Sequence, residues 1–507
     1  MSKLQSLQIY NCEVSELSKI PVIPISDFRD WIIKAAQSGC RISALFGKPL
    51  DKNRVRLFAV LANDEAGTLF LSSADVEESY PSLTAECPQA HWFEREIAEQ
   101  WAITPVGHPW LKPIRFHSSC RKGQDAFGRK PEDKIIPGIT NFFQLTGEEI
   151  HEVAVGPVHA GIIEPGHFRF QCNGEDVFNL EISLGYQHRG IEVALIGGPN
   201  KRTIHYMETA AGDTTIGHAA AYCQIFEALC DCNVSARAQS LRAIALELER
   251  LANHTGDLGA LAGDVGYLPT ASFCGRIRGD FLNMTALICG NRFGRGLICP
   301  GGTGFDLEEK HLTELKGRLA KAAKDITVAV NLLWSTPSVV ARFEETGTLT
   351  QKTCADLGLV GVIARACGID RDCRFNFPSG IYQFAQVPVS TWHTGDVFAR
   401  AYVRWLEIQK SLAFINNQME TLPQRHAAVP LDTLSPEKIV VSLVEGWRGE
   451  ICHVALTGSD GRFSHYKIVD PSFHNWMGLS MALRDQQISD FPLCNKSFNL
   501  SYCGHDL

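Results

Sequence analysis

Glycine, histidine and glutamate recur between Gly156 and Tyr222, a stretch that opens GPVHAGIIEPGHFRF and closes METAAGDTTIGHAAAY. Glycine lets the backbone come close to a ligand, and imidazole exchanges protons near neutral pH. His159, Glu164 and His167 share the first loop, so they are candidate residues for contact with a small ligand or a proton. The alternative is that both histidines only stabilise a glycine-rich turn.

A second candidate group lies on a helix that is predicted to begin near Ser235. At 100° per residue, four polar residues of this helix fall within an arc of about 80°, and leucine and isoleucine occupy a separate arc. Acid, base and imidazole along one stripe could relay protons or couple charge to movement. The alternative is a solvated helix face with stacked ion pairs. The stripe consists of Glu247, Arg250, His254 and Asp257.

The cysteine spacing argues against a metal or cluster site. The chain has 17 cysteines and no C-x-x-C pair; the closest are Cys230 and Cys232. Structural zinc and iron–sulfur sites normally need paired spacing, so we expect free thiols packed as small apolar residues. The run GGTGF after Cys299 lacks the lysine of a phosphate-binding loop, which argues against ATP or NAD.

Composition excludes several classes of protein. The 507 residues carry a net charge of −8 with 21% charged residues, and no basic cluster indicates nucleic acid. The N-terminus lacks the apolar core of a signal peptide, and the longest apolar run, Ile326 to Trp334, is too short to span a bilayer. We therefore expect a cytoplasmic protein, or one peripheral on the cytoplasmic face of a membrane.

The elements that position these residues follow from periodicity and turn signals. Residues 41–74 read as three strands, 92–101 as a helix, and 118–150 as a charged linker or arm. Residues 153–186 predict a small antiparallel sheet with a hairpin at Asn173-Gly174. Helices are then predicted from His218 and Ser235 onward and over 307–334 and 391–420, before a hairpin that precedes Asp470. The predicted fold class is α+β.

Two motif frames carry a resemblance to the large subunit of membrane-bound, energy-converting nickel–iron hydrogenases of the formate hydrogenlyase type, and more distantly to its relative in complex I. The hydrogenase motif E-R-x-C-G-x-C-x-x-x-H aligns with Glu208 to His218, and D-P-C-x-x-C aligns with Asp470 to Asn475. The four metal-binding cysteines are replaced, and such residues cannot hold nickel and low-spin iron. The replacements are Ala211, Thr214, Ser472 and Asn475.

The resemblance implies a domain plan and a vacated metal pocket. Residues 1–117 resemble the 30 kDa-type subunit of complex I, residues 118–150 form the linker, and residues 151–507 resemble the hydrogenase large subunit or 49 kDa-type subunit. Ala211, Thr214, Ser472 and Asn475 would converge beside His218 and Asp470. Such a pocket would either bind water or a small ligand or be filled by side chains and backbone.

The resemblance also implies a function. The chain would be a subunit of a complex I-like oxidoreductase that couples electron transfer to ion translocation, with no metal or other cofactor of its own. Its partners would be a small iron–sulfur subunit and integral ion-pumping subunits at the cytoplasmic face of the inner membrane, with no nucleic acid. His159 aligns with the quinone-binding loop of complex I, which leaves a quinone acceptor open. The alternatives are a non-catalytic scaffold or conformational coupler, and a working hydrogenase or formate hydrogenlyase subunit with unusual ligands.

Overall fold

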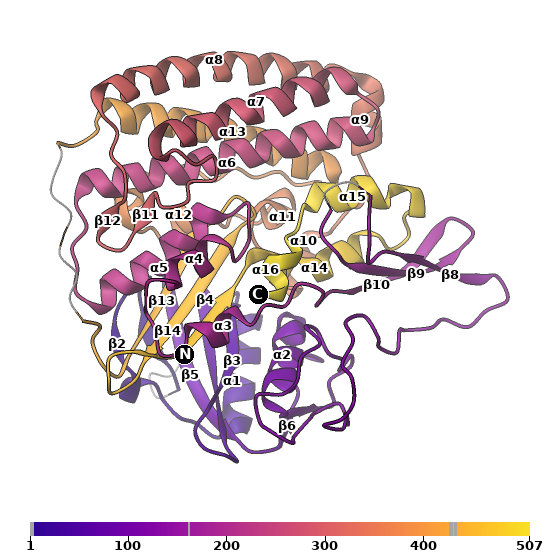
Figure 1. Ribbon diagram of the computed structural model, residues 1–507. Helices are drawn as coiled ribbons and strands as arrows, with labels where there is room; N and C mark the ends of the chain where they lie inside the picture. The colour runs from indigo at the N-terminus through magenta and orange to yellow at the C-terminus, as the bar shows by residue number, and fades with distance from the viewer. Residues whose placement is uncertain (1–4, 161–162, 425–428, 430–432) are drawn as a thin grey trace.

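Two layers of long helices lie above two antiparallel sheets, and the N-terminal sheet with its helices forms the base of the molecule (Figure 1). The computed structural model describes residues 5–160, 163–424, 429 and 433–507. Residues 161 and 162 of the predicted ligand loop therefore lie outside the described residues. The predicted α+β class is confirmed.

The N-terminal sheet has the strand order β1-β5-β4-β3, all antiparallel. Its strands are β1 (Leu7–Ile9), β3 (Arg41–Pro49), β4 (Val55–Asn63) and β5 (Thr68–Val76), which confirms the three strands predicted over 41–74. Helix α1 (Ile25–Gln37) packs on this sheet, and α2 (His91–Trp101) covers β3. The sequence predicted α2 but not α1.

A second sheet is built from the two ends of the chain. Strands β13 (Lys438–Glu445) and β14 (Glu450–Thr457) form the predicted hairpin, β15 (Phe463–Val469) extends it, and β2 (Ser15–Glu16) closes the other edge. Helix α5 (Thr215–Leu229) packs against β13 and β14. A strand near residue 15 thus becomes part of the C-terminal half.

Four long helices form the upper part of the molecule in Figure 1. They are α6 (Ala236–Asp264), α7 (Leu268–Cys289), α8 (Glu309–Trp334) and α13 (Val397–Glu420). The side chain of Ser235 caps α6, and that of Asp396 caps α13 by accepting from the Ala399 amide. The helix predicted over 391–420 begins later, at Val397, because Gly395 takes a positive φ immediately before this cap.

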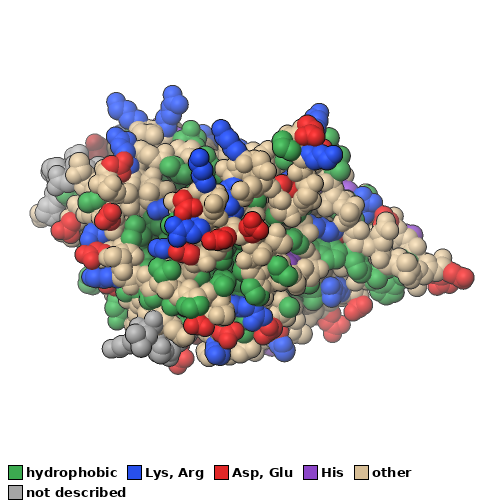
Figure 2. Space-filling view, turned by 90° about the horizontal axis from the view of Figure 1, so that it is seen from below, with side chains coloured by type: hydrophobic (Ala, Val, Ile, Leu, Met, Phe, Trp, Pro, Cys, Tyr) green, Lys and Arg blue, Asp and Glu red, His purple; other side chains and the backbone are tan. Residues whose placement is uncertain are grey.

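The third sheet has the order β10-β9-β8, from β8 (Ile150–Val155), β9 (His167–Asn173) and β10 (Asp176–Ser183), with the predicted turn at Gly174. It forms the tapering end of the molecule in Figures 1 and 2. The remaining elements are short: η1 (Leu17–Lys19), β6 (Ser79–Pro81), η2 (Pro88–Ala90), β7 (Thr104–Val106), α3 (Ile191–Leu195), α4 (Thr203–Glu208), β11 (Ile298–Cys299), β12 (Gly302–Thr303), α9 (Pro337–Phe343), α10 (Gln351–Asp356), α11 (Gly361–Ala366), α12 (Cys373–Asn376), η3 (Gly380–Gln383), α14 (Pro471–Ala482), η4 (Ile488–Asp490), α15 (Phe491–Phe498) and α16 (Tyr502–Asp506).

One hydrophobic core joins the N-terminal sheet to the C-terminal elements, with Phe28 and Phe46 in the same cluster as Val454 and Trp476. Residues 107–149 run between β7 and β8 without a helix or strand. Across the described residues, no single helix is long and apolar enough to cross a membrane; the bent pair α8 and α9, at 79° to one another, passes that test only when the two are taken together.

A buried ion pair also ties the two halves together. The guanidinium of Arg41, on β3, binds both carboxylate oxygens of Glu450, on β14, and contacts Asp64 at 3.0 Å. Arg41 is 1% exposed and Glu450 2% exposed. The pKa of Glu450 falls to about 2 because Arg41 more than offsets the desolvation of the carboxylate.

We expect Arg41→Gln to lower the free energy of unfolding by about 3–5 kcal/mol, because it leaves a buried carboxylate uncompensated. Urea denaturation of the purified chain, followed by tryptophan fluorescence, measures the change. Arg54→Gln is the matched control, since Arg54 pairs with Asp51 on the surface. Equal stability of the two variants would contradict a structural role for the Arg41 pair.

Candidate functional site

Four buried side chains form a continuous chain of hydrogen bonds where α5 meets α14. Nε2 of His218 lies 3.1 Å from Asp470, and its Nδ1 lies 3.0 Å from Nε2 of His453. Nδ1 of His453 in turn lies 3.0 Å from the hydroxyl of Tyr466. None of the four side chains is more than 1% exposed. We call this set the His–Tyr chain.

One arrangement of protons satisfies every contact in the His–Tyr chain. Tyr466 donates to His453, His453 donates to His218 through Nε2, and His218 donates to Asp470. Burial lowers the pKa of His453 well below its usual value and raises that of Tyr466, so both are neutral. Burial alone would raise the pKa of Asp470, but the His218 hydrogen bond lowers it, so the carboxylate is charged.

The positions that align with the missing cysteines are bonded to other parts of the protein. Oγ of Ser472 accepts from the Ser501 amide at 2.8 Å, and Asn475 bonds the amide and carbonyl of Val360 at 3.0 and 3.1 Å. Oγ1 of Thr214 lies 3.3 Å from the guanidinium of Arg448. These groups are hydroxyls and an amide rather than thiolates, and they already have protein partners.

The residues at this place therefore do not fit a nickel–iron centre. Ala211 presents only a methyl group and is fully buried. Within the described ranges, no group of three or more His, Cys, Asp or Glu side chains is placed to hold a metal ion. His218 and Asp470, which the resemblance places beside the centre, bond to one another instead.

The loop of His159, Glu164 and His167 reaches this region through α16. The carboxylate of Glu164 accepts from the amides of Tyr502 and Cys503, at 3.2 and 3.3 Å. His159 hydrogen-bonds the carbonyl of Gly166 at 2.8 Å, and His167 that of Gly156 at 3.3 Å, so both histidines bond within their own loop. Of the three candidate residues, Glu164 is the one that ties the loop to the C-terminal helix.

The polar stripe of α6 is buried, so the hypothesis of a solvated ion-pair face is wrong. Glu247, Arg250 and His254 have no exposed surface, and Asp257 is 4% exposed. The helix lies between α13, α7 and the β13–β14 hairpin, and all four polar side chains face protein. A spacing argument cannot separate a buried polar face from a solvated one, because both have the same period.

Arginine residues from several elements neutralise the stripe. Glu407 on α13 contacts His254 at 2.8 Å, Arg250 at 3.2 Å and Arg365 at 2.7 Å. Glu247 accepts from the hydroxyl of Tyr382 at 2.7 Å. It also contacts Arg374 at 3.1 Å and Arg250 at 3.2 Å, and it accepts from Ser411 at 2.5 Å. Asp257 pairs separately with Arg404 at 2.7 Å.

This network holds one more carboxylate than guanidinium. Its acids are Glu247, Asp372, Glu407 and Glu445, and its bases are Arg250, Arg365 and Arg374. Burial and the charge of Asp372 raise the pKa of Glu445, whereas the arginines hold that of Glu407 well below its usual value despite its burial. The surplus negative charge is therefore relieved most easily by a proton on Glu445.

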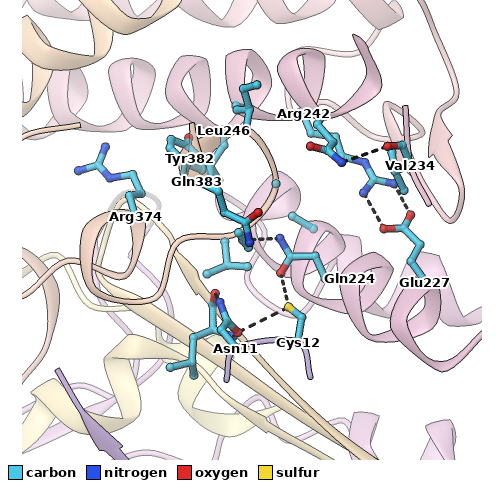
Figure 3. A pocket seen from close by; sticks show the side chains of 18 of the residues that line it. Asn11, Cys12, Gln224, Glu227, Val234, Arg242, Leu246, Arg374, Tyr382 and Gln383 are labelled. Atoms are coloured by element: carbon cyan, nitrogen blue, oxygen red, sulfur yellow. Dashed lines mark hydrogen bonds and ion pairs between the residues drawn. The ribbon is translucent and has the colours of Figure 1, made fainter. Parts of the chain in front are cut away.

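A cavity of about 250 Å³ borders this network, and Figure 3 shows side chains that line it, among them Arg374 and Tyr382. Arg374, Tyr382 and Glu445 form its buried side, and the exposed residues Asn233 and Gln383 lie at its outer side. The walls are mixed: Leu246 and Val234 contribute apolar surface, and the polar part includes Asn11, Cys12, Gln224, Glu227 and Arg242. Glu445 is thus among the residues that border a space large enough for water.

The β13–β14 turn joins the network to the His–Tyr region. Arg250 donates to the carbonyls of Glu445 and Gly446, at 2.7 and 3.1 Å. Two residues after Gly446, Arg448 binds Asp213 at 2.6 and 2.8 Å, directly before Thr214. The network and the start of α5, which carries His218, thus contact the same short turn.

No signal in the sequence indicated the residues that complete both groups, among them His453, Tyr466, Glu407, Arg365 and Glu445. They lie on other elements, and no spacing within one helix indicates them. Glu249 was not predicted either; its carboxylate accepts from the amides of Ile216 and Gly217 at the start of α5. Burial raises the pKa of Glu249 to about 8 in spite of these bonds.

The buried neutral His453 predicts a specific loss of stability in acid. The pKa of His453 is depressed in the folded state. Below about pH 6.5 the unfolded chain therefore binds a proton that the folded chain does not bind, and the free energy of unfolding falls by about 1.4 kcal/mol for each pH unit. We expect His453→Gln to flatten the dependence of the unfolding free energy on pH between about 6.5 and 5 by up to this slope. The exposed His393→Gln variant should leave the slope unchanged. Identical slopes for wild type and His453→Gln would show that His453 is not held neutral.

Models of two protein families match the sequence in separate segments. Residues 36–124 match the 30 Kd subunit of respiratory-chain NADH dehydrogenase, and residues 264–435 match its 49 Kd subunit. The first segment holds most of the N-terminal sheet and α2, and the second holds the long helices from α7 to α13.

Curated relatives span most of the chain. Formate hydrogenlyase subunit 5 of Escherichia coli (strain K12) is 27% identical over 482 residues, 92% of this chain and 84% of the relative. NADH-quinone oxidoreductase subunit 4 of Thermus thermophilus is 27% identical over 370 residues, 68% of this chain and 90% of the relative. The carbon monoxide-induced hydrogenase of Rhodospirillum rubrum is 30% identical over 351 residues, 69% of this chain and 97% of the relative. The chain therefore belongs to the family that unites hydrogenase large subunits with the 30 kDa- and 49 kDa-type subunits of respiratory NADH dehydrogenase.

Proposed function

We propose that this chain is a subunit of a membrane-associated oxidoreductase complex that couples electron transfer to ion translocation and holds no nickel–iron centre. Relatives named as subunits of formate hydrogenlyase, membrane-bound hydrogenase and NADH-quinone oxidoreductase support this class of assembly. Electrons would pass through iron–sulfur clusters of a small partner subunit. Integral ion-pumping subunits would anchor the chain to the cytoplasmic face of the inner membrane.

The observation that carries the proposal is the buried network around Glu247 and Glu407. A set of charges this large is expensive to desolvate, and apolar residues would stabilise the same space equally well or better. The network instead holds a surplus carboxylate, Glu445, beside a cavity that reaches the surface. A proton bound to Glu445 changes the net charge of the network and so the electrostatic attraction on Arg250. Arg250 donates to two carbonyls of the β13–β14 turn, so the turn would respond to this change.

The loop of His159 and Glu164 is the proposed contact with the electron acceptor or a quinone. Glu164 ties this loop to α16, and the Ser501 amide at the start of α16 donates to Ser472. A change at the loop would thus be transmitted to the His–Tyr region through two hydrogen bonds. Val158, beside His159, is 86% exposed, which leaves this loop free to meet a partner protein.

A second candidate function is a scaffold or conformational coupler that carries out no redox step. The hydrogen bonds of Ser472, Asn475 and Thr214 favour it, because they satisfy the polar groups without a ligand. In this case the charge network would serve only to fix the packing of α6 against α13. Coupling measurements on variants of the network distinguish the two functions.

The replacement of all four metal-binding cysteines predicts that the purified complex contains no nickel. The complex, purified with its partners, should contain iron from their clusters but no stoichiometric nickel by elemental mass spectrometry, because oxygen and amide groups cannot replace four thiolates. A nickel–iron hydrogenase complex purified by the same procedure serves as the positive control. One nickel per chain would refute the proposal for the vacated site.

The coupling role predicts that Tyr382→Phe lowers ion transport per electron. The substitution removes the hydroxyl that donates to Glu247 at 2.7 Å, at the place where the cavity meets the network. We expect it to lower the free energy of unfolding by about 1.5–3 kcal/mol, as for the loss of a hydrogen bond to a charged group. Membrane vesicles with the intact complex would be supplied with reduced methyl viologen and a short-chain quinone. Proton uptake and viologen oxidation are measured together, and their ratio should fall.

Tyr402→Phe is the matched control, because Tyr402 also lies in the helix bundle but its ring packs on Trp392 and Phe398 rather than on the network. It should leave the ratio unchanged. Glu247→Gln is a harsher variant, since it removes a carboxylate that both Arg374 and Arg250 contact. Arg374 keeps Asp372 and Arg250 keeps Glu407 as counter-charges, so we expect a loss of stability of about 1.5–3 kcal/mol, as for hydrogen bonds to a charged group. Full coupling in an assembled Tyr382→Phe complex would favour the scaffold function.

A further inference from the structure

A larger cavity, of about 720 Å³, lies between α2, the segment 107–149, β10 and α14. Its volume falls within the range of about 300–1,000 Å³ typical of small-molecule sites. Four aromatic side chains line it: Trp92, Trp110, Phe143 and Phe178. Two of them are unusually accessible for aromatic residues, since Phe143 is 36% exposed and Phe178 40% exposed.

Arg95 lines this cavity and has no counter-charge in contact with it. Its side chain is 6% exposed, and among the described residues no carboxylate lies within ion-pair distance of its guanidinium. It donates instead to the carbonyls of Lys112 and Pro113, at 2.8 and 2.7 Å, and stacks over the ring of Trp92 at 4.7 Å. The carboxylates of Glu181 and Glu99 act on this guanidinium only from beyond contact distance. Burial of Arg95 therefore remains costly, and an anion bound in contact with it would relieve part of that cost.

Further polar groups in the cavity wall also lack partners. Nε1 of Trp92 and Nδ1 of His91 are buried without a hydrogen-bond partner in the described part of the chain, and Trp92 is 8% exposed. Glu181 is the acidic residue of the lining, but its two oxygens are held by Lys112 and by the amide of Phe143, each at 2.8 Å. The exposed Arg484 adds a second cation to the lining.

We propose that this cavity binds an amphiphilic anion, with its carboxylate on Arg95 and its alkyl or aromatic body between the four aromatic side chains. An apolar body suits the aromatic walls, because it removes their surface from water. Nε and Nη2 of Arg95 already donate to the carbonyls of Lys112 and Pro113, so a carboxylate would be bound through Nη1, for which the described residues offer no hydrogen-bond partner. The site is separate from the charge network and the His–Tyr chain, so it does not depend on the proposed coupling function.

Calorimetric titration of the purified full-length chain with decanoate tests the proposal. We expect saturable binding at one site, with decanol and decyltrimethylammonium binding about tenfold more weakly or not at all, because they lack the charge-assisted hydrogen bond to Arg95. Equal binding of the anion, the alcohol and the cation would overturn the proposal, as would the absence of saturable binding by decanoate.

Two variants separate the head group from the body of the ligand. Arg95→Gln should weaken decanoate binding about tenfold while binding of decanol stays the same. Phe178→Ser alters only an exposed wall residue and therefore keeps the proposal testable if Arg95→Gln does not fold; it should weaken decanoate and decanol alike. Arg276→Gln, which changes an exposed arginine on α7, is the control. Unchanged decanoate affinity in either wall variant would refute the assigned site.

Discussion

The pairing of buried guanidinium and carboxylate groups is the interaction on which this structure depends most. Glu407 gathers Arg250, Arg365 and His254 from the elements packed against α13, and Arg41 joins the N-terminal sheet to Glu450 across the domain junction. Each such pair stabilises the fold only while both partners are present, because removing one leaves an uncompensated charge. The helices α6, α11 and α13 are therefore held in one arrangement relative to the hairpin β13–β14.

Local signals in the sequence accounted for much of the fold. The short apolar runs and turn residues over 41–74, the Asn173-Gly174 turn and the three- and four-residue spacing of α6 depend on neighbouring residues, and the structure has these elements where they were predicted. Helix α1 and the edge strand β2 were missed. The pairing of Ser15 with Ile439 depends on a contact between the two ends of the chain, which no local pattern encodes.

The candidate site shows the same division. The motif frames correctly directed attention to His218 and Asp470, which are in contact, but the sequence offered no means of finding His453, since it lies on a strand outside both motifs. The stripe of α6 was identified, yet its environment was not, because burial is decided by Glu407 and the other residues of distant elements that pack against it. The sequence thus indicated which side chains could carry chemistry. It did not indicate the residues in contact with them, which determine whether those side chains are charged.

The strand pairing between the two ends of the chain has a consequence for biosynthesis. Strand β2 is synthesised long before its partner β13, which begins only at Lys438. The C-terminal sheet and the Arg41–Glu450 pair can therefore form only late in translation. Until then, the nascent chain exposes the unpaired edge of β2 and leaves Arg41 without Glu450. A chain truncated before residue 438 lacks both contacts and is open to removal by the cell's quality control, which gives the joined halves a built-in check on the completeness of synthesis.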